Sequence, residues 1–361
     1  MRRVVLSVTN DLITEQRVHK ISLSLMELGC EVLLIGTLKK NSLPLPQKPY
    51  PTHRISVYFQ KGKLFYIEFN LKLLWFLLFV KVDILTANDL DTLLPNFIVS
   101  KLRKKQLVYD SHEYFTEVPE LIYRPFTRRI WLIMEQLIFP KLNKIATTSE
   151  WIAEKYKQQY KKNILVIKNY PKRLNNTIIP NQISNILLYQ GAVNEGRELH
   201  ILIESMKFLK HYKLWIIGEG EKLSELKKLS IQLNVNQQIT FYGKIPFEEL
   251  GNYTKQAGLG INLVNPNSES HRHSLPNKLF DYLQYSLPVI ATDLPEMKEV
   301  ISKNQVGLLL SKPTPEALAS LVNEIFSNKI NYLQLRKNAQ NASQNYCWEQ
   351  QQVLINQLYE P

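Results

Sequence analysis

The chain has 361 residues, of which 45% are hydrophobic and 21% are charged. This balance is typical of a folded globular protein of about two domains, and it excludes a disordered tail, a collagen and a disulfide scaffold. Two cysteines far apart, Cys30 and Cys347, exclude a zinc site built on paired cysteines and favour a reducing compartment. The longest apolar run, residues 73–80, is shorter than the roughly 20 residues of a membrane span, and the first residues predict a strand rather than a secretory signal.

The positive charge is concentrated in the first half of the chain. Residues 1–180 contain 28 Lys and Arg against 15 Asp and Glu, whereas residues 181–361 contain 17 of each. This asymmetry suggests that one domain meets an anionic partner, which could be nucleic acid, anionic lipid or a phosphorylated substrate. Nucleic acid is disfavoured, because the chain has no recognised reading module and its second half is neutral.

Apolar strands alternate with helical patterns through the first half, which we place in a domain at residues 1–172. Residues 4–8 predict the first strand, and helical spacing follows over residues 11–28, where Gly29 ends the helix. Because a parallel crossover needs a dozen residues or more, the alternation predicts a parallel sheet. Further strands are predicted at 31–35, 54–59, 83–86, 106–109, 144–147 and 164–167, and further helices at 66–80, 90–104, 125–139 and 149–159.

The second half repeats the alternation, and we place its domain at residues 180–344. The last 30 residues look helical throughout, and we expect a helix at residues 345–361 to pack back on the first domain. The predicted fold class is α/β, with two Rossmann-like, doubly wound parallel-sheet domains facing across a cleft, where ligands bind at the carboxyl ends of the strands. Strands are predicted at 186–189, 214–217, 239–242, 259–263, 288–291 and 307–310, and helices at 197–209, 221–233, 246–257, 276–286, 295–303 and 314–327.

Two glycine-bearing turns in the second domain are candidate phosphate loops. Gly191 follows a strand, and Gly196 precedes Arg197 at a predicted helix start, where N–H groups and a guanidinium suit an anion. Glu219 lies between two glycines after the next strand. An ordinary strand-to-helix turn explains either segment as well, so both interpretations stay open.

The helix predicted at residues 276–286 carries a pattern that is more specific for a ligand site than the two glycine-bearing turns. Pro276 suits a helix start, and Asn277, Lys278 and Asp281 share its first turns. Lys278 would add a point charge beside a diphosphate at the helix N-terminus, and Asp281 would accept two ribose hydroxyls. Helix capping by Asn277 and an acid placed favourably in the helix dipole explain the same residues.

Polar residues also follow strands of the first domain. His112 lies just past a strand, and the alternative to a functional role is a loop histidine bonded to Glu113. Asn10 and Asp11 lie in the first strand-to-helix loop, where they would either orient an acceptor or cap the helix.

Two further segments invite a metal interpretation. Asp89 and Asp91 have the spacing of a metal-binding acid pair, but we expect one of them to cap the helix that follows. The segment at residues 271–273 has two histidines around an arginine and lacks a nearby third ligand. The sequence therefore predicts no metal site.

Six segments resemble a known family, the retaining glycosyltransferases of family 4 (glycosyl transferase group 1), which have the GT-B fold. Each motif is moderately specific, but their common order over nearly the whole chain is a strong signal. The segments are Asn10-Asp11 with Arg17 to Lys20, Asp83 to Asp89, Tyr109 to Glu113, Val166 to Pro171, Tyr189 to Gly191 with Gly196-Arg197, and Leu275 to Thr292.

The resemblance implies a metal-independent, cofactor-free transferase that moves a hexosyl group from a nucleotide-diphosphate-sugar to a glycan or lipid-linked acceptor, in cell-surface polysaccharide synthesis. His112, Arg197 and Lys278 would be catalytic, the two cations stabilising the leaving diphosphate. The acceptor would be bound by Asn10, Asp11 and Glu113. The donor would be bound by Gly191, Arg197, Glu219, His273, Ser274, Leu275, Pro276, Asn277, Lys278 and Asp281.

Two positions depart from the family pattern. Ala192 stands where the family usually has an arginine after the first glycine of the phosphate loop. His273 stands where the family has the acid that touches the donor sugar. The shared fold leaves a nucleotide-sugar epimerase as one alternative, and the departures leave a non-catalytic nucleotide-sugar-binding subunit of a transferase complex as another.

The basic first half also predicts peripheral binding to the anionic, cytoplasmic face of the cell membrane. Basic residues cluster at 101–105, 124–129 and 155–162, and aromatic residues that we expect to be exposed accompany them. A buried helix over residues 71–80 is the alternative. The aromatic residues are Phe65, Tyr66, Phe69, Trp75, Phe76 and Phe79.

Overall fold

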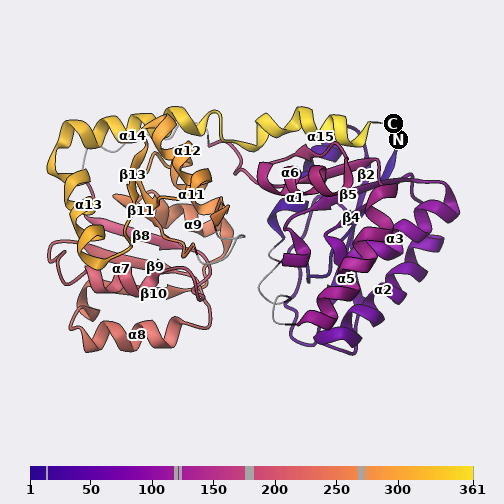
Figure 1. Ribbon diagram of the computed structural model, residues 1–361, viewed down its shortest axis with the longest axis horizontal. Coiled ribbons are helices and arrows are strands. Elements are labelled where there is room, and N and C mark those ends of the chain that lie inside the picture. The colour runs from indigo at the N-terminus through magenta and orange to yellow at the C-terminus, as the bar shows by residue number, and fades with distance from the viewer. Residues whose placement is uncertain are drawn as a thin grey trace. The chain divides into compact units, whose positions relative to one another are not determined.

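Figure 1 shows the computed structural model, in which the chain divides into two compact units. Unit 1 comprises Met1–Asn169 with Gln351–Pro361, and unit 2 comprises Tyr170–Gln350. Ser274, predicted to bind the donor, lies outside the described residues. The structure describes residues 1–13, 15–117, 121, 124–174, 183–266, 272–273 and 275–360.

Unit 1 is built on a sheet of seven parallel strands. The strands are β1 (Arg3–Ser7), β2 (Glu31–Leu38), β3 (Thr52–Ser56), β4 (Ile84–Asn88), β5 (Gln106–Ser111), β6 (Lys144–Thr147) and β7 (Leu165–Val166). Their order is β3-β2-β1-β4-β5-β6-β7, so β1 and β4 are neighbours although two strands separate them in the chain. The chain therefore continues from β1 toward one side of the sheet and from β4 toward the other. Ligands of this fold class bind in the crevice at the carboxyl ends of such a pair of strands.

The helices of unit 1 follow its strands in alternation. They are α1 (Gln16–Glu27), α2 (Gly62–Phe79), α3 (Leu90–Arg103), α5 (Pro125–Ile138) and α6 (Glu150–Tyr160), with the short 3₁₀ helices η1 (Phe115–Glu117) and η2 (Phe139–Lys141). The chain returns to unit 1 at its end in α15 (Gln352–Tyr359), where the Tyr359 hydroxyl lies 3.1 Å from Oγ1 of Thr86. In the described part of the chain, no helix combines the length and the apolar character needed to cross a membrane.

The first helix begins five residues later than the sequence predicts. The Asn10 carboxamide accepts from the backbone N–H of Leu12 at 2.9 Å, and the Asp11 carboxylate accepts from Ile13 at 3.3 Å. These side chains close local turns, and Leu12 has a left-handed backbone (φ 69°). Glu15 caps the helix instead, by accepting from the N–H of Val18. The helix-capping alternative for Asn10 and Asp11 is therefore wrong.

Helix α2 has one buried and one exposed apolar face. Phe65, Phe69, Leu73 and Leu77 pack into the core of unit 1. The predicted exposure of Phe65 and Phe69 is therefore wrong, because these positions share the face that meets the sheet. The aromatic residues on the opposite face, Trp75 and Phe79, are exposed as predicted.

Unit 2 contains a second parallel sheet, of six strands. The strands are β8 (Ile186–Gln190), β9 (Lys213–Ile217), β10 (Ile239–Gly243), β11 (Leu259–Asn262), β12 (Val289–Thr292) and β13 (Gly307–Leu310). In the order β10-β9-β8-β11-β12-β13, the pair β8 and β11 forms the corresponding switch point. Two α/β units with parallel sheets confirm the predicted fold class.

The helices of unit 2 pack on its sheet, and buried side chains of the helices and of the strands together form its core. They are α7 (Leu199–Ser205), α8 (Leu223–Gln232), α9 (Phe247–Thr254), α11 (Asn277–Gln284), α12 (Pro295–Asn304), α13 (Pro315–Ser327) and α14 (Lys329–Ser343), with η3 (Asn236–Gln238) and η4 (Trp348–Gln351). The last 30 residues are not one continuous helix, because turns and η4 separate α14 from α15.

The two faces of α2 predict opposite responses to truncation. We expect Phe69→Ala to lower the free energy of unfolding by about 3–5 kcal/mol, because its fully buried ring leaves a cavity. Phe79→Ala, on the exposed face, should change it by less than about 1 kcal/mol. Urea denaturation followed by circular dichroism measures both, and equal losses would contradict the assignment of the faces.

Candidate functional site

The unit 1 site is organised around the buried carboxylate of Asp110, near the end of β5. The Arg17 guanidinium holds it with two hydrogen bonds, Nε to Oδ2 at 2.9 Å and Nη2 to Oδ1 at 2.7 Å. Nη1 of Arg17 also donates to the carbonyl oxygen of Ile167 at 2.6 Å. One buried cation therefore ties α1 to β5 and to the segment that follows β7.

His112 is held between two carboxylates. Its Nε2 lies 3.2 Å from Oδ2 of Asp110, and its Nδ1 lies 3.4 Å from Oδ2 of Asp89. Its backbone N–H also donates to Oδ1 of Asp89 at 2.7 Å. The loop-histidine alternative expected Glu113 to be the hydrogen-bond partner of His112. In the structure the two ring nitrogens of His112 lie beside Asp110 and Asp89. The side chain of His112 is 17% exposed, so it is not completely enclosed by the protein.

The capping role expected for Asp89 or Asp91 is wrong. Asp89 occupies the N-cap position of α3 with a left-handed backbone (φ 59°), and its carboxylate turns to His112. Asp91 accepts a hydrogen bond from the Thr9 hydroxyl at 2.6 Å, which connects α3 to the loop after β1. Both carboxylates therefore help to build the site and do not cap the helix, since Asp89 accepts from His112 and Asp91 accepts from Thr9.

The charges of this cluster determine its protonation. Burial alone would lower the pKa of His112, but the charges of Asp89 and Asp110 raise it to about 9. Although burial opposes it, the charges of Arg17 and His112 hold the pKa of Asp110 well below its usual range. Burial raises the pKa of Asp91 to about 7, with a contribution from the charge of Asp89. At neutral pH these charges favour the imidazolium form of His112, in which both ring nitrogens donate hydrogen bonds.

The three residues predicted to bind the acceptor lie in two loops of unit 1. Asn10, whose amide donates to Glu15 at 2.6 Å, and Asp11 belong to the loop after β1. The Thr9 contact with Asp91 brings that loop to the same sheet edge as His112. Glu113 is exposed next to His112, and its carbonyl oxygen accepts from the Ser111 hydroxyl at 2.8 Å.

In unit 2, two of the predicted glycines allow loops to approach closely. Gly191 (φ 131°) donates from its N–H to the carbonyl oxygen of Ile217 at 2.9 Å. A Cβ added at Gly218 (φ 142°) would overlap the carbonyl oxygen of Gly191. Both positions therefore require glycine, and the loops after β8 and β9 lie against each other.

Lys278, in the first turn of α11, lies beside this junction. A Cβ added at Gly191 would lie 3.1 Å from Nζ of Lys278, and that nitrogen is 3.7 Å from the ring centroid of Tyr189. Burial lowers the pKa of Lys278 well below its usual range, the charge of Arg197 lowers it further, and Asp281 opposes both. The structure thus brings Gly191, Lys278, Arg197 and Asp281, which are all predicted to bind the donor, into one neighbourhood.

Asp281 lies in the second turn of α11, within the first turns of the helix as predicted. The Gln190 amide donates to its Oδ2 at 3.4 Å, which places it at the carboxyl end of β8. The capping alternative for Asn277 is wrong, because Pro276 occupies the N-cap position and Asn277 is the first residue of the helix.

The remaining predicted donor residues are spread around this neighbourhood. The carbonyl oxygen of Glu219 accepts from Val193 at 2.9 Å, so its main chain joins the two glycine loops. Helix α7 begins at Leu199, two residues after Arg197. The carbonyl oxygen of Gly196 accepts a hydrogen bond from the backbone N–H of Asn265 at 2.8 Å. The half-buried members are His273, Leu275 and Pro276.

Sequence reasoning assigned no role to Arg17 or Asp110, although both lie inside quoted motifs. A signal for Arg17 exists: it shares the helix face of Ile21 and Leu25, both buried. A charge on an apolar stripe needs a buried partner. The sequence does not reveal that this partner is Asp110, 93 residues away. Across the described residues, His, Cys, Asp and Glu side chains form no group of three or more suited to a metal ion.

The raised pKa of His112 predicts a pH-dependent stability. Its ion pairs should stabilise the fold fully below about pH 6.5, and this contribution should be lost as the pH rises through about 9. We therefore expect the difference in melting temperature between wild type and His112→Gln to shrink between pH 6.5 and pH 10 in thermal unfolding. His211→Gln, at an exposed position, is the control. A difference that is constant with pH would contradict the charged state of His112.

Comparison with known proteins finds a glycosyltransferase family model that matches each half of the chain. The family model for "Glycosyl transferases group 1" matches residues 174–342, and that for "Glycosyltransferase Family 4" matches residues 14–170. The chain is 24% identical over 219 residues to an uncharacterized glycosyltransferase of Methanocaldococcus jannaschii, covering 60% of this chain and 59% of that protein. It is 23% identical over 140 residues to the amylovoran biosynthesis glycosyltransferase AmsK of Erwinia amylovora, covering 38% of this chain and 34% of that protein.

The chain therefore spans less than two thirds of the length of either curated relative. Among solved structures, Anabaena HepE in complex with UDP and glucose has the same fold, with a TM-score of 0.74, 13% identity and 99% coverage of both chains. Because the two family models together cover most of the sequence, one in each half, this chain belongs to the group 1 glycosyltransferases of family 4 and has the GT-B fold.

Proposed function

We propose that the protein is a retaining glycosyltransferase that moves a sugar from a nucleotide-diphosphate-sugar to a glycan or lipid-linked acceptor. Unit 2 would bind the donor, and unit 1 would bind the acceptor. Membership of the family supports glycosyl transfer, and a protein of the same fold, HepE, has been solved with UDP and glucose.

The observation that carries the proposal is the pair of cations beside the glycine loops of unit 2. Lys278 is only 9% exposed, and Arg197 lies near enough to lower its pKa. Two cations held close together are costly unless anions join them, and a diphosphate would add negative charge to that of Asp281, the carboxylate that acts on Lys278. A diphosphate in this place would favour the charged form of Lys278 and would accept hydrogen bonds from both side chains.

The same cations would act on the reaction itself. As the bond between the sugar and the diphosphate breaks, negative charge grows on the departing phosphate oxygen, and Arg197 and Lys278 would stabilise it. The acceptor oxygen would attack the same face of the sugar and pass its proton to that phosphate oxygen, so a retaining transfer needs no protein nucleophile. We propose that neither a metal nor a further cofactor takes part.

Asp281 and His112 would position the two substrates. The Asp281 carboxylate, beside the end of β8, is suited to accept hydrogen bonds from two ribose hydroxyls. His112, held as an imidazolium by two aspartates, would donate to an oxygen of the sugar near the bond that breaks. Asn10, Asp11 and Glu113 would orient the acceptor.

The cellular role follows from the same resemblance. The relative AmsK is named for amylovoran biosynthesis, which supports a biosynthetic role, and we propose synthesis of a cell-surface polysaccharide. We also propose that the protein works on the cytoplasmic face of the membrane, because the net positive charge of the chain resides in residues 1–180.

The diphosphate site is tested by removing its cations. We expect Lys278→Met and Arg197→Ala each to weaken binding of the cognate nucleoside diphosphate by about 10- to 100-fold, because each removes a charge-assisted hydrogen bond. Calorimetric titration with UDP, GDP, ADP and CMP identifies the nucleotide and measures the loss. Lys303→Ala, at an exposed position of α12, is the control, and unchanged affinity in both site variants would remove these residues from the site.

Removal of the imidazolium should affect turnover rather than nucleotide binding. We expect His112→Gln to lower donor turnover by about 100-fold while the affinity of unit 2 for the nucleotide stays unchanged. Release of nucleoside diphosphate from the donor measures the rate. Conversion of the donor to a stereoisomer without release would instead establish the epimerase alternative, and nucleotide binding without turnover would establish the non-catalytic subunit.

A further inference from the structure

Helices α2 and α5 of unit 1 each present a stripe of apolar side chains to solvent. On α2 the stripe is opposite the buried face, and Trp75 and Phe79 are 68% and 69% exposed. On α5 it includes Phe126, which is 70% exposed. The spacing of three or four residues places each set on one face of its helix. The two stripes consist of Leu64, Ile67, Leu71, Trp75 and Phe79 on α2, and Phe126, Ile130, Ile133 and Leu137 on α5.

The two helices are in contact, so both stripes lie in the same part of unit 1. The rings of Tyr66 and Trp131 have centroids 5.5 Å apart, and Nζ of Lys63 lies 4.6 Å above the ring of Phe126. Figure 1 shows α2, α3 and α5 gathered in the same part of unit 1. An exposed apolar region of this kind marks an interaction surface in a protein.

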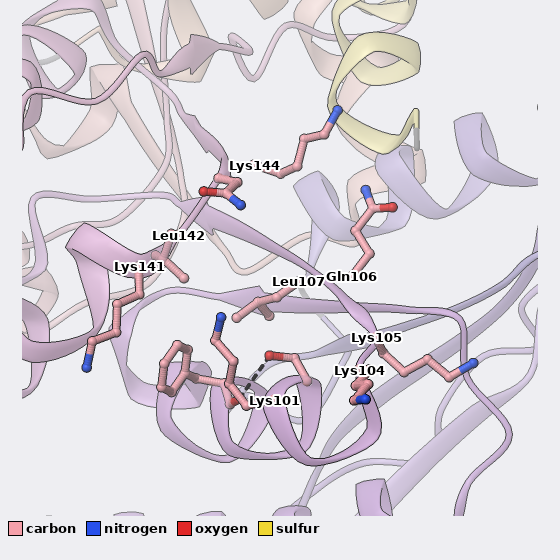
Figure 2. Close-up of a pocket in the computed structure, with 11 residues that line it drawn as sticks. Lys101, Lys104, Lys105, Gln106, Leu107, Lys141, Leu142 and Lys144 are labelled. Carbon is pink, nitrogen blue, oxygen red and sulfur yellow. Dashed lines mark hydrogen bonds between the residues drawn. The ribbon is translucent and has the colours of Figure 1, made fainter.

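A lysine-lined pocket lies at the C-terminal end of these helices (Figure 2). Its volume is about 540 Å³, and within the described chain every charged residue that lines it is a lysine. Lys101 and Lys141 approach the ring of Phe97 from α3 and η2, with Nζ 5.5 and 5.9 Å from its centroid. The charged lining residues are Lys101, Lys104, Lys105, Lys141 and Lys144.

The pocket is continuous with the helices that carry the stripes. Arg103, beside the pocket on α3, donates to the carbonyl oxygens of Leu77 and Val80 at the end of α2, at 2.8 and 2.7 Å. Lys141 belongs to η2, which directly follows α5. Because the pocket lies at the amino ends of β5 and β6, it is at the opposite edge of the sheet from His112, and it is separate from the unit 1 site.

The chemistry of this surface fits an anionic lipid bilayer better than a second copy of the chain. Apolar and aromatic side chains that enter the headgroup region, together with lysines that meet lipid phosphates, are the features of interfacial membrane helices. A symmetric contact between two copies would instead bring the same lysine-rich region to both sides of the interface, and like charges there oppose association.

We propose that the apolar stripes of α2 and α5 dock on an anionic phospholipid bilayer and that the lysine pocket receives a lipid phosphate. The proposal rests on the membrane location proposed above and not on glycosyl transfer. Partitioning of the apolar stripes would hold the protein at the headgroup boundary, and the lysines would make the binding depend on anionic lipid and on salt.

Vesicle flotation of the full chain tests both the apolar stripes and the lysine pocket. We expect binding to vesicles of phosphatidylcholine with phosphatidylglycerol, and about tenfold weaker binding to phosphatidylcholine alone or at high salt. The triple variant Lys101→Ala, Lys104→Ala, Lys141→Ala should lose about tenfold in affinity for the anionic vesicles. The double variant Trp75→Ser, Phe79→Ser should lose a similar factor.

Matched controls remove the same groups from unit 2. Lys207→Ala, Lys210→Ala, Lys228→Ala removes the same charge from exposed positions, and Ile231→Ser, Ile330→Ser removes two exposed apolar side chains. Neither should change vesicle binding. Nucleotide titration of every variant checks folding and the donor site independently of the vesicles. If the full chain does not bind anionic vesicles but still binds nucleotide, the membrane proposal is wrong and the proposed transferase function is unaffected.

Inorganic pyrophosphate separates a lipid phosphate from a soluble anion. If pyrophosphate raises the melting temperature through the three lysines while anionic vesicles are not bound, the pocket is a site for a soluble anion and the bilayer proposal is wrong. Equal effects of the lysine triple variant and its unit 2 control on vesicle binding would also overturn it, because the binding would then follow net charge alone.

Discussion

The unit 1 site depends on the buried ion pair of Arg17 and Asp110. Taking both charges out of water is costly, and the pair is tolerable because two mutual hydrogen bonds and a third to Ile167 satisfy the guanidinium. The pair fixes the end of β5 against α1. Oδ2 of Asp110 also faces Nε2 of His112, so the pair helps to orient the imidazole. Although burial opposes it, the charges of Asp89 and Asp110 together favour the protonated ring.

The two candidate sites use opposite electrostatic arrangements. In unit 1, two cations are matched by the carboxylates of Asp89 and Asp110, so the cluster is complete within the chain. In unit 2, Lys278 and Arg197 lie together and burial depresses the pKa of the lysine. A paired arrangement is suited to position a substrate, whereas a buried lysine beside a second cation favours binding of an anion. This difference is the physical reason for proposing the diphosphate site in unit 2.

The two edges of the unit 1 sheet also differ in chemistry. At the carboxyl ends of the strands, acids and bases are paired in a small, mostly buried network. At the amino ends, lysines around Phe97 face solvent beside two apolar helix stripes. A parallel sheet separates such surfaces because its two edges are formed by different loops. The large positive charge of this half of the chain is therefore compatible with a neutral site.

The sequence by itself determined the alternation of strands and helices, the parallel sheets and the family, because apolar periodicity and motif order are local properties of the chain. Through the family resemblance it also assigned Gly191, Lys278 and Asp281 together to the predicted donor site. The tertiary structure alone decided that Asp89 and Asp110 face His112, that Phe69 is buried while Phe79 is exposed, and that Arg17 binds Asp110. These outcomes depend on which side chains meet across up to 93 residues of sequence, and no local pattern encodes such contacts.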